Sequence, residues 1–271
     1  MTTDEGPLAR ALRLMAARPD DPAARMACYA ALADAELHLM LDGEAEGDRV
    51  RPAIVTLEEG AFALGFDSEE GLADFAEGPV GHVTLPGRIV AQLLAGQGVG
   101  LAVNPGGAGT GFLCPPEALA WLAGTLGRRP DRAALRPVAW APPDGVPAAL
   151  AAALAARLEG LAGLARRAHL VKARYEDDST GLLLVVEGAR PEAEEAIAKA
   201  LAEAALFSGA GGEGLDVTFL PEGAPALARL AAQAMRLDIP DPEPEAAAPG
   251  AGAASAPAGP GMDPARPPRL R

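Results

Sequence analysis

Apolar side chains recur along the first half of the chain at both helical and strand spacings, which predicts an alternation of helices and strands. The first predicted helix illustrates the helical spacing, because its apolar residues Leu8, Leu12 and Met15 fall on one helical face. In order, the predicted elements are helices over 7–18 and 22–35, a strand over 36–41, a hairpin of strands over 50–57 and 61–66, a helix that holds Leu72 and Phe75, a strand over 82–85, a helix over 86–95, a strand over 99–104 and a helix over 115–127. Together they predict one α/β domain over residues 7–127.

A second unit follows a stretch rich in Pro, Arg and Ala, which we interpret as a linker over 128–146. Its predicted elements are a helix over 147–165, strands over 168–175 and 181–187, a helix from Pro191 to about Leu206, a strand over 215–220 and a helix over 224–236. This α-β-β-α-β-α order is typical of a small α+β layer sandwich over 147–237. The expected fold class is therefore α/β to α+β, with two small mixed-sheet α/β domains.

The end of the chain has a different composition. Residues 241–271 consist mainly of Pro, Ala and Gly and lack large apolar side chains. Burial of such a segment would not offset the entropy lost on ordering it. We therefore predict a disordered C-terminal tail.

Composition and charge narrow the functional classes. Hydrophobic residues make up 49% of the 271 positions, which is enough for sizeable cores, and the formal net charge is −14. Such an acidic chain repels nucleic-acid phosphates and anionic lipid surfaces, so we expect neither as a partner. The N-terminal residues lack an apolar leader, and Cys28 and Cys114 stand far apart without metal-ligand spacing. We expect a bacterial, cytoplasmic protein whose thiols are reduced.

The most distinctive segment runs from Gly98 to Gly107, where a buried strand breaks into a loop at Asn-Pro-Gly-Gly. Asn104 can end a strand in a turn, Pro105 fixes φ, and the following glycines allow a sharp exit. The glycine spacing differs from G-x-G-x-x-G, and no Lys-Ser/Thr pair follows, so nucleotide binding is not indicated. Loops at the carboxyl ends of strands often bind ligands in α/β folds, so this loop is a candidate pocket or partner groove.

Three segments of the first half are similar to a known family. They are Phe62 to Leu72, Leu85-Pro86-Gly87, and Gly100 to Gly107 with its Asn-Pro-Gly element. On these motifs the chain resembles the SseB family, named for enhanced serine sensitivity and distinct from the type III secretion protein of the same name. Asp67 stands where the family usually has Thr. The second half resembles the family's C-terminal domain in its order of elements.

The resemblance implies a cytoplasmic accessory protein, and it carries over no cofactor and no catalytic residue. The residues themselves agree, because His38, His82 and His169 have no Cys, Asp or Glu at ligand spacing, so we expect no metal site. Cys114 precedes Pro115 at a helix start, a position that can lower the pKa of a thiol, although Glu117 opposes this.

The leading hypothesis is a non-enzymatic protein that acts by binding an as yet unidentified protein partner. We expect the contact surface to include six residues around the Asn104 loop: Phe66, Ser68, Asn104, Pro105, Gly106 and Gly107. Two alternatives stay open. One is binding or sensing of a small molecule such as an amino acid, which the family name suggests, and the other is a thiol enzyme that uses Cys114.

Overall fold

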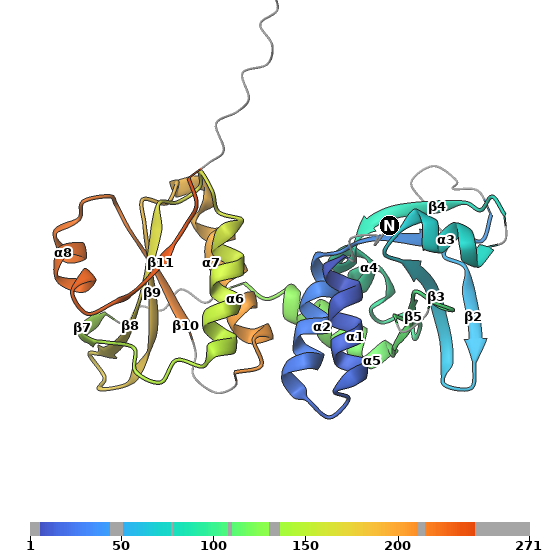
Figure 1. The fold of residues 1–271 in the computed structure, drawn as a ribbon, viewed down its shortest axis with the longest axis horizontal. Helices are drawn as coiled ribbons and strands as arrows, with labels where there is room; N and C mark the ends of the chain where they lie inside the picture. Colours follow the sequence, from blue (N-terminus) through green and yellow to red (C-terminus); the bar gives the residue numbers. More distant parts are fainter. Residues whose placement is uncertain are drawn as a thin grey trace, which may run out of the picture.

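The chain folds around two mixed β-sheets, each covered by helices on both faces (Figure 1). The computed structural model describes residues 6–43, 51–76, 78–107, 110–129, 136–210 and 215–241. The helices that lie between the two sheets come from both halves of the chain, so the halves meet helix against helix. The predicted fold class is confirmed: both sheets mix parallel and antiparallel pairs.

The first sheet has six strands, in the order β4-β1-β3-β5-β6, with β2 also paired to β3. Only β3 and β5 run parallel among these pairs. The elements are α1 (Pro7–Ala17), α2 (Pro22–Asp34), β1 (Glu36–Met40), β2 (Ile54–Leu57), β3 (Gly60–Phe66), α3 (Glu69–Ala76), β4 (His82–Pro86), α4 (Gly87–Leu94), β5 (Gly100–Val103), β6 (Phe112–Cys114) and α5 (Pro116–Leu126).

Alternation along β1 decides which side chains lie on each face of this sheet. Leu37 and Leu39 are fully buried and join the main core, beneath α1, α2, α4 and α5. His38 and Met40, which alternate with these leucines, therefore lie on the opposite face, because successive strand residues point to opposite sides. Helix α3 covers that second face and places Leu72 among its apolar residues. The imidazole of His38 thus lies on the face of the sheet that α3 covers.

The second sheet has five strands, in the order β10-β9-β8-β11, with β7 also paired to β8. Its elements are β7 (Pro137–Ala141), α6 (Ala148–Glu159), β8 (Arg167–Tyr175), β9 (Thr180–Glu187), the single 3-10 turn η1 (Pro191–Ala193), α7 (Glu194–Phe207), β10 (Leu215–Leu220), α8 (Pro225–Ala231) and β11 (Met235–Asp238). Leucines of α6 and α7 pack on one face, and α8 packs on the other.

Three short strands correct the sequence analysis. Strand β6 stands between the Asn104 loop and α5, where no strand is predicted. Strand β7 lies inside the predicted linker and pairs with β8, because Trp140 packs against that sheet. The last helix is predicted over 224–236, but in the structure it ends at Ala231, and β11 follows it at the sheet edge. Helix α6 also ends earlier than predicted, at Glu159. The tail from 242 onward lies outside the described residues.

Helix α7 joins the two domains through both apolar and polar contacts. Phe207, at its C-terminal end, is buried in the core cluster of the first domain. Lys199 Nζ donates to the carbonyl oxygen of Leu126 over 2.6 Å and so caps the C-terminal end of α5. Gly209 follows the helix with a φ of +68°, and a Cβ there would lie 2.8 Å from Ala23 Cα. Only glycine fits this close approach without a shift of the backbone.

Candidate functional site

Asn104 connects the carboxyl ends of the parallel strands β3 and β5 through hydrogen bonds. Its backbone N–H donates to the carbonyl oxygen of Gly65 over 2.9 Å. Its side-chain Oδ1 accepts from the backbone N–H of Asp67 over 3.0 Å. The residue is buried and adopts a left-handed φ of 46°, which asparagine tolerates better than most residues. Asn104 therefore fixes both the end of β5 and the start of the segment that leads into α3.

The structure brings the predicted site residues together around this turn. Phe66 lies buried beneath Phe75 of α3, and their ring centroids are 5.3 Å apart. Ser68 Oγ accepts from the backbone N–H of Gly71 over 3.2 Å and caps the first turn of α3. Gly106 and Gly107 are exposed, whereas Pro105 is half-buried. Phe66 thus supports from below the surface that the loop and α3 form, whereas Ser68 is exposed on that surface and caps the helix.

Phe75 is the aromatic residue that this surface exposes, and it is absent from the six predicted contact residues. Its side chain is 40% exposed, and a Cβ on Gly106 would lie 3.8 Å from its ring. The helical pattern that groups Phe75 with Leu72 favours a core position for both, yet only Leu72 is buried. We call the exposed part the α3–Asn104 surface; its members are Ser68, Glu70, Asp74, Phe75, Pro105, Gly106 and Gly107.

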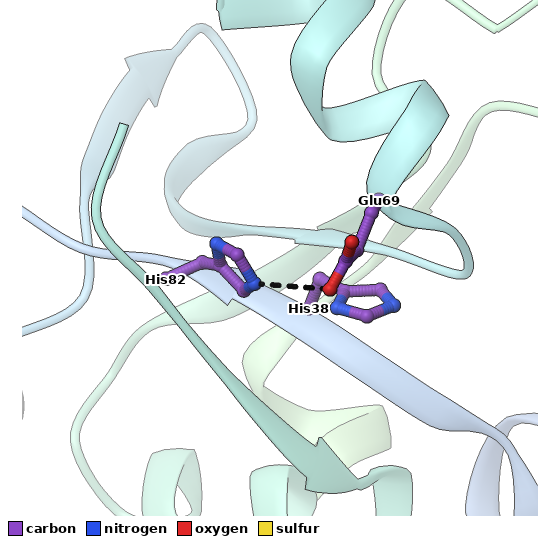
Figure 2. Close-up of side chains that lie close together, drawn as sticks. All are labelled: His38, Glu69 and His82. Atoms are coloured by element: carbon purple, nitrogen blue, oxygen red, sulfur yellow. Dashed lines mark ion pairs between the residues drawn. The ribbon is translucent and has the colours of Figure 1, made fainter. Parts of the chain in front are cut away.

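Two histidines that the sequence analysis treats as unrelated lie side by side next to this surface. His38 on β1 and His82 on β4 have ring centroids 5.5 Å apart, and Glu69 at the start of α3 points toward both (Figure 2). His82 Nε2 lies 3.7 Å from Glu69 Oε1. One ligand atom from each residue lies within 4.8 Å of the other two. The expectation that no carboxylate accompanies these histidines is therefore wrong.

The third histidine is isolated from this cluster and has a structural setting. His169 of β8 is buried, and its Nε2 lies 3.3 Å from Glu187 Oε2 of β9. Arg167 approaches the same carboxylate oxygen at 3.8 Å. The buried imidazole is thus hydrogen-bonded, as buried polar groups usually are.

Neither cysteine has the environment of a reactive thiol. Cys28 and Cys114 are both fully buried and free. Burial, with smaller contributions from the neighbouring Cys28 and Glu117, raises the pKa of the Cys114 thiol to about 12. The same desolvation raises the pKa of Cys28 to about 12. The expected lowering of the Cys114 pKa is therefore wrong, because β6 places that side chain in the core before the helix begins. The geometry gives no support to a thiol enzyme.

A cavity of about 550 Å³ lies where the two domains meet. Small side chains, mainly alanines of α2 and α6, form much of its wall. Arg18, Asp21, Asp34 and Arg157 add charges of both signs. Across it, Arg157 donates to Asp34 Oδ2 over 2.8 Å, while Arg88 donates to Asp34 Oδ1 over 2.8 Å. This is a pocket of ligand size at a domain interface, where small-molecule sites are common.

Together these features define a two-domain α/β protein in which the α3–Asn104 surface lies at the carboxyl ends of the parallel strands β3 and β5. Residues 8–121 match the model of the family described as SseB protein N-terminal domain. The first domain therefore belongs to the SseB N-terminal domain family, and the resemblance drawn from the sequence is confirmed for that domain. The likeness of the second domain to the family's C-terminal domain stays a prediction. No curated protein and no solved structure matches the chain.

The helices of the described residues are all too short or too polar to cross a bilayer.

Proposed function

We propose that this protein acts by binding a protein partner at the α3–Asn104 surface and performs no chemistry of its own. The observation that carries the proposal is the exposed Phe75 ring, which rests on buried Phe66 beside the glycines of the Asn104 turn. Aromatic anchors surrounded by polar residues are typical of the centres of protein interfaces. The partner would act in the cytoplasm, where we also propose that this protein resides.

The charge of the surface favours a basic partner. Helix α3 carries the exposed acids Glu69, Glu70 and Asp74 and contains no basic residue. The whole chain has a formal net charge of −14, so the long-range field has the same sign. Complementary charge speeds association and disfavours acidic competitors. We therefore propose a polypeptide segment in which lysines or arginines flank an apolar residue that packs on Phe75.

The surface is also held in place before any partner arrives. Asn104 bonds to Gly65 and Asp67, and Ser68 caps the helix that carries Phe75. A preformed surface loses little conformational entropy on binding, so more of the contact energy appears as affinity.

The test is native co-purification with three versions of the full chain: wild type, Phe75→Ala and Leu93→Ala. Leu93 is the matched control, because it is 47% exposed and lies on α4, which covers the opposite face of the sheet. We expect a stoichiometric partner with wild type and Leu93→Ala, and its loss with Phe75→Ala. The interaction should also weaken as salt rises. Equal recovery with all three versions, or recovery of no partner, would refute the proposal.

A second candidate function is the binding of a small zwitterion in the interdomain cavity. The specific observation is that Asp34 and Arg157 meet at its wall, so carboxylate and guanidinium groups could each face an opposite charge of an amino acid. A thermal-shift series over the amino acids tests it, because a ligand that binds only the folded state raises the midpoint. A response that Asp34→Ala abolishes supports this function, and a flat response to all amino acids removes it.

A further inference from the structure

We propose that His38, His82 and Glu69 form a binding site for a divalent transition-metal ion such as Zn²⁺. The three side chains come from β1, β4 and α3, and they converge on one point at the surface (Figure 2). The site lies beside the α3–Asn104 surface: neither histidine belongs to that surface, and Glu69 is one of the acids of α3.

The strand register explains why the two histidines meet. His38 pairs with Thr84 and Met40 pairs with His82 in the antiparallel ladder of β1 and β4. Residues two apart on a strand share a face, so His38 and His82 are diagonal neighbours on one side of the sheet. Glu69 reaches them because Ser68 caps α3 above that same face. Backbone geometry, rather than chance side-chain placement, therefore brings the three donors together.

The separations suit an ion between the donors better than a direct contact. His82 Nε2 and Glu69 Oε1 are 3.7 Å apart, which is too far for a good hydrogen bond. Two ligands on a tetrahedral Zn²⁺, each bonded at about 2.0–2.1 Å, lie about 3.3 Å apart. All three donors lie within 4.8 Å, so small rotations would bring them onto one ion. Glu69 is 73% exposed and free to make that adjustment.

The donor set selects the class of metal. Two imidazoles and one carboxylate are typical of Zn²⁺ and of neighbouring transition metals, and this set leaves a fourth position for water. Mg²⁺ and Ca²⁺ prefer oxygen ligands and should bind poorly. The Thr84 hydroxyl, 3.0 Å from His38 Nδ1, is a further polar group that orients the His38 ring.

A bound ion would join α3 to β1 and to the edge strand β4 of the first sheet. Glu69 stands two residues after Asp67, whose backbone N–H bonds to Asn104. The ion would therefore add a third anchor to the segment that carries Phe75, in addition to the Asn104 bond and the Ser68 cap. Metal occupancy would in this way stabilise the first domain and restrain the end of α3.

The experiment is titration of the tag-free full chain with Zn²⁺ by calorimetry, followed by Co²⁺ absorption spectra. We expect one Zn²⁺ per chain with a Kd on the order of 10 μM or tighter, and no heat with Mg²⁺. His38→Ala, His82→Ala and Glu69→Gln should each weaken binding at least about tenfold, since loss of even an outer partner of a metal ligand costs that much. Glu70→Gln is the matched control, because this exposed acid is in the same first turn but outside the cluster.

Spectra and melting curves distinguish this site from adventitious binding at surface carboxylates. Co²⁺ at the site should give visible ligand-field bands that disappear in His38→Ala and His82→Ala and persist in Glu70→Gln. Saturating Zn²⁺ should raise the unfolding midpoint of wild type by a few degrees and leave that of the histidine variants unchanged. The variants' metal-free melting curves confirm that they fold. Zn²⁺ binding that the histidine variants leave unchanged, or no binding below about 100 μM, would overturn the proposal.

Discussion

Phe207 of the second domain packs edge-to-face on Trp121 of the first, with ring centroids 6.1 Å apart and an interplanar angle of 88°. Phe207 is 5% exposed and belongs to the core of a domain other than its own. Replacement by alanine removes most of that apolar area and leaves a cavity, which typically costs about 3–5 kcal/mol. We expect Phe207→Ala to lower the free energy of unfolding by about that amount, as measured by urea denaturation.

The preceding residue supplies the control for this prediction. Leu206 is 51% exposed on the same helix, so Leu206→Ala should change the free energy of unfolding by no more than about 0.5 kcal/mol. Phe207→Ala should also separate the transitions of the two domains, because it removes a buried aromatic contact between them. If both variants unfold in one transition with wild-type stability, the domains do not depend on this contact.

The ion pair between Asp34 and Arg157 should contribute little to stability and should depend on salt. Arg157 donates to Asp34 over 2.8 Å, but the two side chains are 29% and 41% exposed. Pairs of this kind typically contribute about 0.2–1 kcal/mol. A double-mutant cycle with Asp34→Ala and Arg157→Ala should give a coupling energy in that range.

The same coupling should decrease at high ionic strength, because salt screens partly exposed charges. Arg88 also bonds to Asp34, so Asp34→Ala alone should cost more than Arg157→Ala. A coupling energy above about 2 kcal/mol that salt does not change would mean that the pair is more buried than the structure indicates.

Asn104 should be hard to replace because it satisfies two requirements at once. Its φ of 46° disfavours alanine, and its Oδ1 satisfies the N–H of Asp67. Asn104→Gly keeps the backbone conformation and loses only the hydrogen bond, at a cost of about 1–2 kcal/mol. Asn104→Ala adds backbone strain of about 1–2 kcal/mol. Chemical denaturation should therefore rank wild type above Asn104→Gly and Asn104→Ala last. Equal stability of the two variants would show that backbone strain is unimportant at this turn.

The sequence predicts most helices and strands because their apolar periodicity is strong. The exceptions are short. Strand β6 has three residues and β11 has four, too few for a period to show, and β7 begins with Pro137 in a segment whose composition is typical of linkers. Proline is tolerated there because β7 is an edge strand. Local pattern cannot reveal a strand whose stability comes from pairing with a distant neighbour.

The candidate sites also differ in whether local sequence or pairing between distant segments determines them. The Asn104 turn is predictable, since an Asn-Pro-Gly-Gly sequence after a buried strand specifies a local backbone shape. The meeting of His38 with His82 is not, because they are 44 positions apart (82 − 38) and only the β1–β4 register places them together. Cys114 is misjudged for a related reason: nothing local shows that β6 pairs with β5 and turns this thiol into the core.

The two buried thiols should make stability depend on alkaline pH. Burial raises the pKa of Cys28 and of Cys114 from an ordinary value near 9 to about 12. Above about pH 9 the unfolded chain loses these protons while the native chain keeps them, so unfolding is favoured as the pH rises. Their contribution is fully present below pH 9 and is lost as the pH approaches 12.

Urea denaturation at pH 8, 9 and 10 should show the free energy of unfolding falling above pH 9. The slope should become less steep by up to about 1.4 kcal/mol per pH unit for each thiol removed, in Cys28→Ala and in Cys114→Ala. Alanine lowers stability at every pH because it is smaller, so the slope is the informative quantity. Native protein should also resist thiol reagents at pH 8 until it unfolds, since the side chains are inaccessible and protonated. Rapid labelling of Cys114 in the folded protein would contradict both its burial and its raised pKa.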